Sequence, residues 1–356
     1  MAYSTIIKPS DYFDTKLYTG NASTNAITGV GFQPDMAWLK QRNSTPDHYL
    51  YDAIRGVQNY ITPNLATQQQ ANATSLTAFN SDGFTLGSNA ATNANSGTFA
   101  SWNWKANGAG SSNSDGNITS TVSANTTSGF SIVKYTGNGV IYGGIVGHGL
   151  GKVPKMMMVK NLSTGETDWA VYHASLGNTK NMRLNNTDTV ATRTAFWNNT
   201  TPTSSLFYLS NNGNVNASGQ DYVAYCFADI QGYSKFNSYI GNGNATTPPF
   251  VYTGFKPAFV MTKVSSGSAN SWTLSDITRD NSITGGNGIG ARLLADTNSA
   301  EETNNIWASI QKYSNGFSPQ GNDGVTNASG STYIYMAFAE NPFVANVGES
   351  LPTTAR

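Results

Sequence analysis

Charged side chains are scarce in this sequence. They make up 11% of its 356 residues, and the 20 acidic residues balance the 20 basic ones. Nucleic acids and anionic membranes both attract proteins through concentrated Lys and Arg. The composition therefore argues against nucleic acid or a membrane as a partner. Asn, Thr, Ser and Gly take the place of the missing charges, which is typical of a β-rich, hydrogen-bonding surface.

Cysteine and long apolar runs are also nearly absent. Cys226 is the one cysteine, so the sequence excludes a disulfide framework within the chain. The first residues have neither the basic nor the apolar region of a secretory signal, and no run reaches the length of a membrane span. We therefore expect a protein that is made in a cytosol, stays there or leaves by lysis, and does not insert into a membrane.

One stretch of the chain occurs three times. Its copies are GFQPDMAWLK, GKVPKMMMVK and GFKPAFVMTK, at residues 31–40, 151–160 and 254–263. Gly, Pro and Lys hold the same offsets in each copy and frame an apolar run. Self-similarity at a period of roughly a hundred residues indicates three copies of one small domain.

Further landmarks repeat around this stretch. LYTGN, KYTGN and SYIGN precede the three copies, and each is typical of a strand that runs into a turn. An aromatic residue stands nine residues after each Lys, at Tyr49, Trp169 and Trp272. The last shared landmarks are Phe84, Phe207 and Phe317, each followed by an aromatic strand. Insertions fall between the landmarks, as expected of loops.

The pattern predicts an all-β fold of three tandem β-sandwich repeats of jelly-roll type, because short strands alternate with Gly-rich turns and no helical period is sustained. We expect strands in the first copy at 15–18, 36–40, 49–54, 84–87 and 99–105, and one short helix within 65–76. The predicted organisation is a lead-in at 1–10, repeats at 11–107, 118–230 and 231–343, a flexible linker at 108–117 and a C-terminal tail at 344–356.

The apolar residues of two strands in each copy indicate which faces of those strands are buried. In the closing strand of the first copy, Trp102 and Trp104 share one face, and the equivalent residues of the other copies are also apolar, so we expect both rings to point inward. In the repeated stretch both faces are apolar, as with Trp38 on one side and Leu39 on the other. A neighbouring repeat or a second subunit is expected to cover the second face.

Residues that could catalyse a reaction or bind a metal do not form a convincing set. His48, His148 and His173 stand at unrelated places, which favours surface or hydrogen-bonding roles. Cys226 aligns with Asn103 and Ala337, which favours a small packed side chain over a nucleophile. We therefore expect neither an enzyme nor a cofactor.

Acidic residues cluster loosely. The pairs are Asp47 with Asp52, Asp276 with Asp280, and Glu301 with Glu302. Glycoside hydrolysis needs two carboxylates facing one sugar, and Asp47 and Asp52 align with Thr167 and Tyr172 in the second copy, which weighs against that chemistry. Calcium bound by Asp276, Asp280 or Asp323 is an open alternative, although no loop has the spacing of a calcium motif.

Two glycine-rich segments resemble nucleotide loops only in part. GHGLGK at 147–152 lacks the Ser or Thr of a phosphate-binding loop, and GGNGIG at 285–290 lacks the strand and helix of a dinucleotide site. Aromatic residues suggest sugar stacking instead, but the landmark tryptophans, with Trp197 and Trp307, are better explained as core. The loop residues Tyr60, Tyr142 and Tyr233 remain as candidates.

A longer series of motifs resembles a known family. It includes SGFSIVKYTGNG, GHGLGKVPKMMMVKN, DWAVYHASLG, YVAYCFADIQGYSKF and YIYMAFAENPF. The chain is similar, from about residue 11 to 343, to virion proteins of marine bacteriophages, which are described as structural or tail-fibre-like with lectin-like jelly-roll domains. The resemblance maps no catalytic or binding residue.

The resemblance implies a virion component that is made in the host cytoplasm and contacts other virion proteins. We expect a tail appendage that binds host glycans, because a long fibre would begin with an anchor or stalk and here the first repeat starts by about residue 11. Capsid decoration or tail joining without a ligand is the alternative, and a polysaccharide depolymerase is a third. By analogy with phage appendages we expect a homo-oligomer, with a trimer as the first choice.

Overall fold

The computed structural model describes residues 4–279, 288–303 and 309–342. Its backbone is almost entirely β-structure in antiparallel sheets, which confirms the predicted all-β class. Within the described residues, the helical elements are the 3-10 helix η1 (Pro9–Asp11) and the short helix α1 (Ala90–Asn93). The predicted lead-in at 1–10 is described only from residue 4, and the predicted tail at 344–356 lies outside the described residues.

The same order of four antiparallel strands recurs in three segments, residues 13–104, 120–227 and 234–342, called repeats 1, 2 and 3 below. In repeat 1 the order is β1 (Phe13–Thr19), β9 (Thr98–Trp104), β3 (Met36–Gln41) and β4 (Tyr49–Asp52). In repeat 2 it is β12 (Phe130–Thr136), β19 (Asp221–Phe227), β14 (Met156–Asn161) and β15 (Ala170–His173). In repeat 3 it is β20 (Ser234–Ile240), β28 (Thr332–Pro342), β22 (Phe255–Ser266) and β23 (Thr273–Asp276).

A second, smaller sheet completes each sandwich. It contains β2 (Asn25–Thr28), β8 (Gly83–Leu86) and β7 (Leu76–Asn80) in repeat 1, and β13 (Gly144–Gly147) with β18 (Leu206–Leu209) in repeat 2. In repeat 3 it contains β21 (Val251–Tyr252), β27 (Gly316–Pro319), β26 (Ile310–Tyr313) and β24 (Gly288–Ile289). The remaining short strands are β5 (Asn59–Tyr60), β6 (Gln70–Ala71), β10 (Ser111–Asn113), β11 (Ser120–Asn125), β16 (Lys180–Arg183), β17 (Ala191–Thr192) and β25 (Leu293–Leu294).

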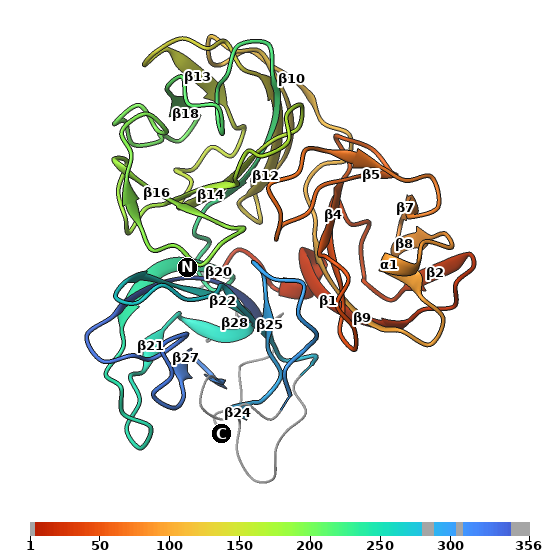
Figure 1. The fold of residues 1–356 in the computed structure, drawn as a ribbon, viewed down its shortest axis with the longest axis vertical. Helices are drawn as coiled ribbons and strands as arrows, with labels where there is room; N and C mark the ends of the chain where they lie inside the picture. Colours follow the sequence, from red (N-terminus) through yellow and green to blue (C-terminus); the bar gives the residue numbers. More distant parts are fainter. Residues whose placement is uncertain (1–3, 280–287, 304–308, 343–356) are drawn as a thin grey trace.

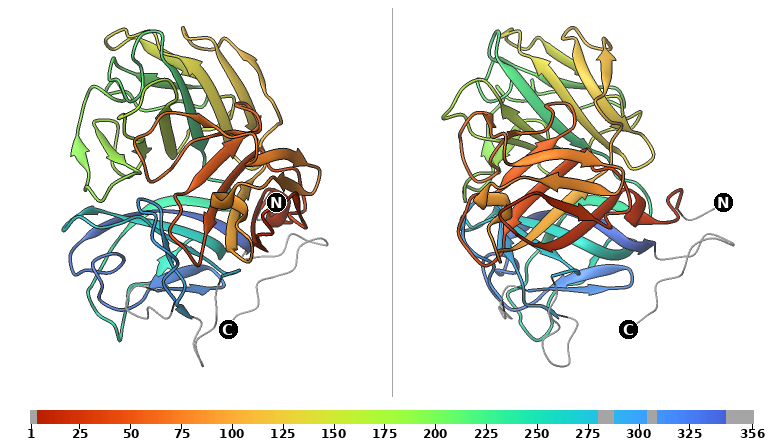
Figure 2. Two further views of the ribbon diagram at one scale, coloured as in Figure 1. Left: turned by 45° about the vertical axis from the view of Figure 1, so that its right-hand side comes forward. Right: turned by 90° about the vertical axis from the view of Figure 1, so that its right-hand side faces the viewer.

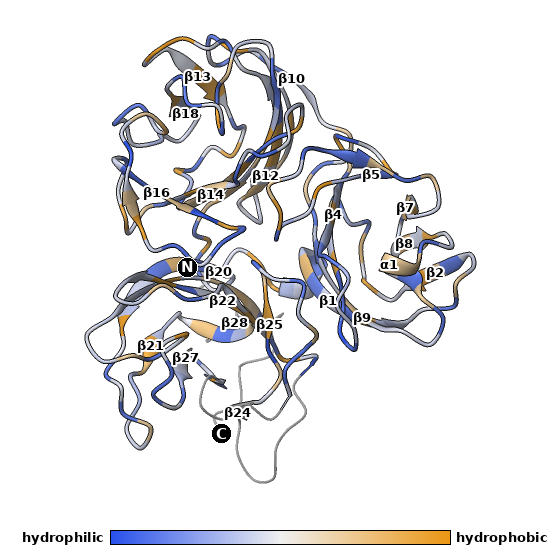
Figure 3. Cartoon of the chain, viewed as in Figure 1, coloured by the Kyte–Doolittle hydropathy of each residue, from blue (hydrophilic) through white to orange (hydrophobic). Residues whose placement is uncertain are grey.

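The three repeats form three lobes around one centre (Figure 1). Seen from the side, repeat 1 lies in front of the centre, with repeats 2 and 3 above and below it (Figure 2). The main sheets turn one face to that centre, and hydrophobic residues are concentrated on their strands, as on β14 (Figure 3). The core therefore has two parts: an interior inside each sandwich and one shared between the repeats.

Alternation along the strands separates these two parts. Ala37 and Leu39 of β3 face the interior of their own sandwich, whereas Met36 and Trp38 face the shared core. The corresponding residues of β14 and β22 divide in the same way. The second apolar face of the repeated stretch is thus covered by neighbouring repeats of the same chain. A second subunit is not needed to explain it.

Three equivalent aromatic residues meet in the shared core: Trp104, Phe227 and Phe338. Their ring centroids are 6.4 Å apart for Trp104–Phe227, 6.1 Å for Phe227–Phe338 and 5.9 Å for Trp104–Phe338. Trp102 and Trp104 are buried, as predicted, but they pack between the repeats and not within their own sandwich. Burying one such side chain contributes roughly 1.5–3 kcal/mol, so the shared core is a major source of stability.

The Tyr-x-Gly-Asn landmark forms the same hydrogen-bonded corner in each of the three sandwiches. In repeat 2, the Tyr135 hydroxyl donates to the Val215 carbonyl at 2.7 Å, and Asn138 and Asn216 exchange hydrogen bonds through backbone and amide. The same contacts recur in repeat 1 for Tyr18, Asn21 and Asn93, and in repeat 3 for Tyr239, Asn242 and Asn327.

Gly is required in this corner because the chain passes close to another segment. A Cβ atom at Gly137 would lie 2.3 Å from the Ala217 carbonyl oxygen, and Gly20 and Gly241 are equally crowded. In repeat 2 the Tyr135 ring also stacks on Tyr222 of β19. It packs edge-on against the landmark Phe207, with ring centroids 5.9 Å apart. The repeated sequence therefore encodes a packing unit.

Three local expectations do not hold. Residues 65–76 form no helix; β6 lies there and β7 begins at Leu76, because pairing with β5 and β8 outweighs helix propensity. Part of the predicted linker at 108–117 is strand β10, which pairs with β11. Finally, Tyr49 pairs with Leu39 as Ala170 pairs with Val159, so His48, and not Tyr49, is the equivalent of Trp169 and Trp272.

Candidate ligand-binding site

Polar contacts join the repeats in a closed cycle. The Tyr225 hydroxyl of repeat 2 donates to Asp52 of repeat 1 at 2.6 Å, and the Trp102 Nε1–H of repeat 1 donates to Asp276 of repeat 3 at 3.0 Å. The third position, His173 of repeat 2, faces the Tyr335 carbonyl of repeat 3 at 3.3 Å. Asp52, His173 and Asp276 are equivalent, so each repeat holds the next through the same site.

The two buried carboxylates are neutralised locally. Asp52 pairs with Arg55, and Asp276 pairs with Arg279 at 2.5 Å. Burial alone would raise the pKa of Asp276, but the Arg279 guanidinium and the Trp102 N–H outweigh it and lower that pKa below its ordinary value. Each arginine thus compensates the charge of a buried carboxylate that also accepts a hydrogen bond from a neighbouring repeat.

Glu301 extends the junction between repeats 3 and 1. It pairs with Arg279 at 3.0 Å and with Arg42 at 2.7 Å, and its own N–H donates to the Arg42 carbonyl. Its neighbour Glu302 pairs with Arg292 at 2.9 Å. Both glutamates of the sequence pair are thus used in ion pairs that stabilise the fold.

All three histidines are buried and neutral. Each accepts an N–H at Nδ1 and faces a main-chain carbonyl with Nε2, so Nε2 carries the proton. Burial lowers the pKa of His48 to about 3 and that of His173 to about 4, and it also lowers the pKa of His148. The hydrogen-bonding role predicted for them is correct, but none lies on the surface.

The Lys that ends each repeated stretch is also buried. Lys160 donates to the Ala66 carbonyl of repeat 1 at 3.0 Å, and Lys263 donates to the Thr187 carbonyl of repeat 2 at 2.7 Å. Lys40 bonds the carbonyls of Gln41 and Ser44. Burial lowers the pKa of all three lysines to about 8. Two of them join neighbouring repeats.

The acid alignment made from the sequence is wrong by one position. Asp47 accepts from the Asn64 amide as Asp168 accepts from the Asn185 amide, so Asp47 is equivalent to Asp168 and not to Thr167. By strand register, Asp52 is equivalent to Asp276. Asp323 accepts the Val325 N–H in a turn, and Asp280 lies outside the described residues. Among residues 4–279, 288–303 and 309–342, no group of three or more His, Cys, Asp or Glu side chains could bind a metal ion.

The cysteine and the remaining tryptophans are either buried or outside the described residues. Burial raises the pKa of Cys226 to about 12, in keeping with a packed thiol. Trp197 is buried, and Trp307 lies outside the described residues, as does the first half of GGNGIG, residues 285–287. The residues 147–152 lead into strand β14.

Of the three candidate tyrosines, two are occupied by packing. Tyr233 is buried in the shared core, which rules it out, and Tyr60 packs on Tyr49 with ring centroids 4.5 Å apart. Tyr142 is 58% exposed at a loop tip, next to the exposed side chains of Val140 and Ile141. Of the three tyrosines, Tyr142 alone remains accessible for stacking on a ligand, and Phe250 and Tyr252 of repeat 3 are similarly exposed.

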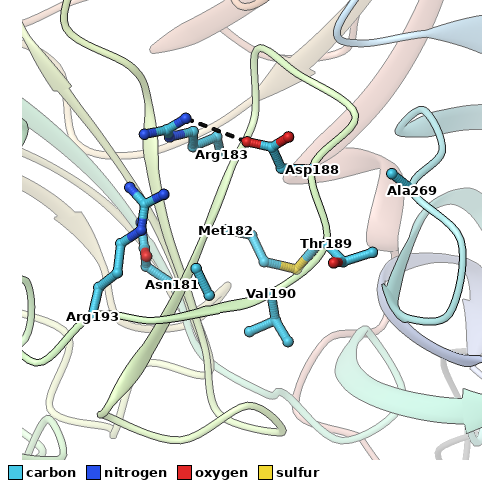
Figure 4. Close-up of a pocket in the computed structure, with 9 residues that line it drawn as sticks. Asn181, Met182, Arg183, Asp188, Thr189, Val190, Arg193 and Ala269 are labelled. Carbon is cyan, nitrogen blue, oxygen red and sulfur yellow. Dashed lines mark hydrogen bonds and ion pairs between the residues drawn. The ribbon is translucent and has the colours of Figure 1, made fainter.

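A pocket of about 290 Å³ lies between repeats 2 and 3, beside β16 and β17. Its volume is close to the lower end of the range for small-molecule sites, roughly 300–1,000 Å³. Figure 4 shows Arg193 and Asn181 on one side of the pocket, and Thr189 and Ala269 on the other. Met182 and Val190 give it an apolar wall.

Repeat 2 has smaller side chains than repeats 1 and 3 at two positions that line the pocket. By strand register, Asn181 and Ala191 are equivalent to Tyr60 and Gln70 in repeat 1. In repeat 3 the same two positions carry the ion-paired Arg292 and Glu302. Larger side chains thus stand at both positions in the other repeats, a difference that shows only when the register of these two-residue strands is known.

The polar groups of the pocket are not all paired. Arg183 is neutralised by Asp168 at 2.9 Å and Asp188 at 3.3 Å, whereas Arg193 forms no ion pair with the described residues and lies over the Phe196 ring, 5.9 Å from its centroid. Asn181 is 1% exposed, and its amide N and O have no hydrogen-bond partner in the described part of the chain. A buried unpaired polar group costs roughly 1–3 kcal/mol, and since both amide atoms are closed off from solvent, this amide is a local cost and not a contact for a bound molecule.

The described residues contain no helix that is long and apolar enough to cross a membrane. Residues 8–342 match the model of a family described as a domain of unknown function, DUF7483, and the chain belongs to that family. No curated protein and no solved structure matches the chain.

Proposed function

We propose that this DUF7483 chain is a structural protein on the surface of a bacteriophage particle, with a recognition role toward host glycans. One observation supports this role most strongly. The groups that could carry chemistry, namely the buried carboxylates, arginines, histidines and lysines, are bonded within the repeats or across the junctions between them. Such an arrangement suits a rigid particle component better than an enzyme.

The surface supports the recognition part of the proposal. It is poor in charge, it displays Tyr142 on a loop tip, and it contains the pocket between repeats 2 and 3. Aromatic rings and pockets with a few polar groups are common features of small-molecule sites, which is compatible with binding of a saccharide. We assign the chain to a short tail appendage on the particle. It contacts other virion proteins there and reaches the virion from the host cytoplasm.

Purified particles test the placement. We expect mass spectrometry of gradient-purified virions to detect the chain and immunogold labelling to decorate tails. Labelling of heads instead would favour the alternative, a capsid decoration or tail-joining protein without a ligand. Absence from particles that are otherwise complete would refute the virion role.

Two further measurements separate the remaining possibilities. A depolymerase would lower the viscosity of host polysaccharide, and we expect the pure chain to leave it unchanged. Light scattering should give the mass of a homo-oligomer, with a trimer expected by analogy with phage appendages. The mass of a monomer would contradict that expectation, and the three lobes of a single chain would then be the only threefold arrangement of the protein.

A further inference from the structure

We propose that the free edge of strand β21 in repeat 3 is a docking site for an extended segment of a partner polypeptide, which joins the sheet as a parallel strand. The segment that fits is uncharged and has Asn followed by a β-branched residue. The proposal goes beyond the proposed function and does not depend on where the chain sits on a particle. Repeat 2 shows what such a segment looks like, because the equivalent edge is occupied there.

In repeat 2, the segment that joins repeats 1 and 2 covers the free edge of β13. Ile118 of this segment lies beside Val146 in a parallel bridge. The Ile118 N–H donates to the Ile145 carbonyl at 3.0 Å, and the Ile145 N–H donates to the side-chain oxygen of Asn117 at 2.9 Å. The added residues therefore satisfy both main-chain groups that Ile145 turns away from its partner strand β18.

Strand register shows that β21 is the counterpart of β13. Val251 pairs with the landmark Phe317, as Val146 pairs with Phe207, and both strands lie at the edge of their sheet. Residues along an antiparallel strand turn their N–H and C=O groups to alternate sides. The two residues that flank Val251 therefore turn these groups away from β27, as Ile145 turns its own away from β18.

Within the described part of the chain, nothing occupies this edge in repeat 3. Phe250 and Tyr252, which flank Val251, form no main-chain hydrogen bond there outside the ladder with β27. Residues 228–233, which join repeats 2 and 3, are used in the turn between β19 and β20. Val251 is 6% exposed, whereas Val146 beside its added segment is 0% exposed. The edge is thus free for a strand from elsewhere.

The surroundings of this edge set the chemistry of the partner. The Phe250 and Tyr252 side chains are 52% and 57% exposed, and residues 241–252 contain no charged side chain. Exposed apolar side chains beside a free edge add contacts to the main-chain hydrogen bonds of an added strand. Pro248 and Pro249 lack N–H groups, so they end the available edge at Phe250. The site therefore takes a short, uncharged segment.

The occupant of the edge in repeat 2 specifies two positions of that segment. Asn117 contributes the side-chain oxygen that accepts the outward N–H, and Ile118 contributes the N–H that donates to the outward carbonyl. The Ile118 side chain is 5% exposed and packs into the sandwich interior together with Val146. A β-branched residue suits this place because it favours an extended backbone.

Repeat 1 offers a matched control. Its edge strand β2 has the same place in the sandwich, with Ala26 and Thr28 on either side of Ile27. Neither residue supplies a large apolar side chain, and Lys16 lies beside the end of β2, with its Nζ atom 3.5 Å from the Gly29 carbonyl. Small side chains and a nearby charge both disfavour strand addition. We therefore expect the partner segment to bind repeat 3 and not repeat 1.

The test uses the full chain and a peptide with the sequence of residues 116–121, GNITST, with both ends blocked. NMR titration should show saturable binding, and the amide hydrogens of Phe250 and Tyr252 should exchange at least about tenfold more slowly at saturation. Those of Ala26 and Thr28 should not change. The Ile118→Pro peptide lacks the donor N–H and should bind at least about tenfold more weakly.

Variants of the chain then locate the binding. Tyr252→Pro removes an outward N–H and leaves the ladder with β27 intact, so it should abolish peptide binding. Thr28→Pro is the same change at the edge of repeat 1 and should bind the peptide normally. Phe250→Ser keeps the main chain, removes the ring and should weaken binding at least about threefold. The melting temperature verifies that each variant is folded.

Three results would overturn the proposal. One is a peptide that does not bind at millimolar concentration, and another is equal binding by the wild type and by folded Tyr252→Pro and Phe250→Ser variants. The third is slow exchange of the Phe250 and Tyr252 amides in the chain alone. It would show that the C-terminal tail or a second copy of the chain already occupies the edge.

Discussion

Moving one indole ring from β3 to the position just before β4 is the sharpest test of packing in the shared core. Repeat 1 has Trp38 on β3 and His48 before β4, whereas repeats 2 and 3 have Met158 with Trp169 and Met261 with Trp272 at the same two positions. His48 Nε2 faces the Leu294 carbonyl at 3.0 Å, as the Trp169 indole N–H faces that of Thr62. We therefore expect the double variant Trp38→Met with His48→Trp to fold like the wild type.

The single changes should each be costly. Trp38→Met leaves a cavity and removes the N–H that His48 Nδ1 accepts at 2.9 Å, which should cost roughly 2–5 kcal/mol. His48→Trp alone places two indoles where one fits and leaves the Trp38 N–H without its acceptor, with a cost of about 1–3 kcal/mol from overpacking. The double variant should recover most of both losses, which appears as a coupling energy in a double-mutant cycle.

The pH dependence gives the same test a second readout. Burial lowers the pKa of His48 from 6.5 to about 3, so the unfolded chain takes up a proton before the folded one as the pH falls. The stability linked to His48 is complete above pH 6.5 and is lost progressively below it. At pH 5 the loss is about 2 kcal/mol. A variant without His48 should not show it.

Urea unfolding followed by tryptophan fluorescence at pH 7 and pH 5 measures both effects. The free energy of unfolding of the wild type, minus that of the double variant, should fall by about 2 kcal/mol between the two pH values. Two results would contradict the reasoning. A double variant no more stable than the weaker single variant would show that the ring positions are not equivalent, and a difference independent of pH would show that His48 is not held neutral.

Three further predictions concern single contacts. Asp276→Asn should destabilise the chain by roughly 3–5 kcal/mol in urea at pH 7, because it removes the carboxylate that the buried Arg279 and Trp102 contact. Asp229→Asn is the control, because the Asp229–Lys235 ion pair is partly exposed, and it should cost less than about 1 kcal/mol; similar costs for both would count against a buried junction. Asn216→Ala should cost roughly 1–3 kcal/mol and Asn178→Ala, on the surface, much less; a melting temperature unaffected by Asn216→Ala would argue against the amide corner. The unfolded chain keeps the Lys263 proton up to a pKa near 10.5 and the folded chain only to about 8, so the wild type should gain about 1.5 kcal/mol relative to Lys263→Met between pH 8 and pH 9.5, and a constant difference would refute the lowered pKa.

Much of the fold could be predicted from the sequence because local sequence patterns determine the strands and turns. The Gly, Pro and Lys offsets identify β3, β14 and β22, and the Tyr-x-Gly-Asn landmark marks the corner that precedes each of them. The helix expected in 65–76 failed because strand pairing there overrides propensity. The equivalence of His48 with Trp169 was missed because the loop before it is one residue shorter in repeat 1, and an alignment by aromatic type chose Tyr49.

The contacts between repeats could not be predicted in the same way. Trp102 and Asp276 lie 174 residues apart, and nothing local to either one indicates the other. The sequence did show that Trp102 is inward, but the direction of the partner depends on how the three sandwiches are arranged. The pocket was also hidden, since Ala269 of repeat 3 lines it together with residues 181–193 of repeat 2, and nothing local to either segment indicates the other.

The closed cycle of junctions affects how the chain can fold as it leaves the ribosome. Trp102 emerges early, yet its acceptor Asp276 belongs to the last third of the chain, and Trp104 must wait for Phe338. At synthesis rates of about 5–20 residues per second, the nascent chain therefore exposes its aromatic sheet face for roughly ten seconds or longer. During that time the first sandwich exposes an apolar sheet face that has no partner. We therefore expect translation speed and chaperones to affect the yield of folded protein more than the stability of any one repeat does.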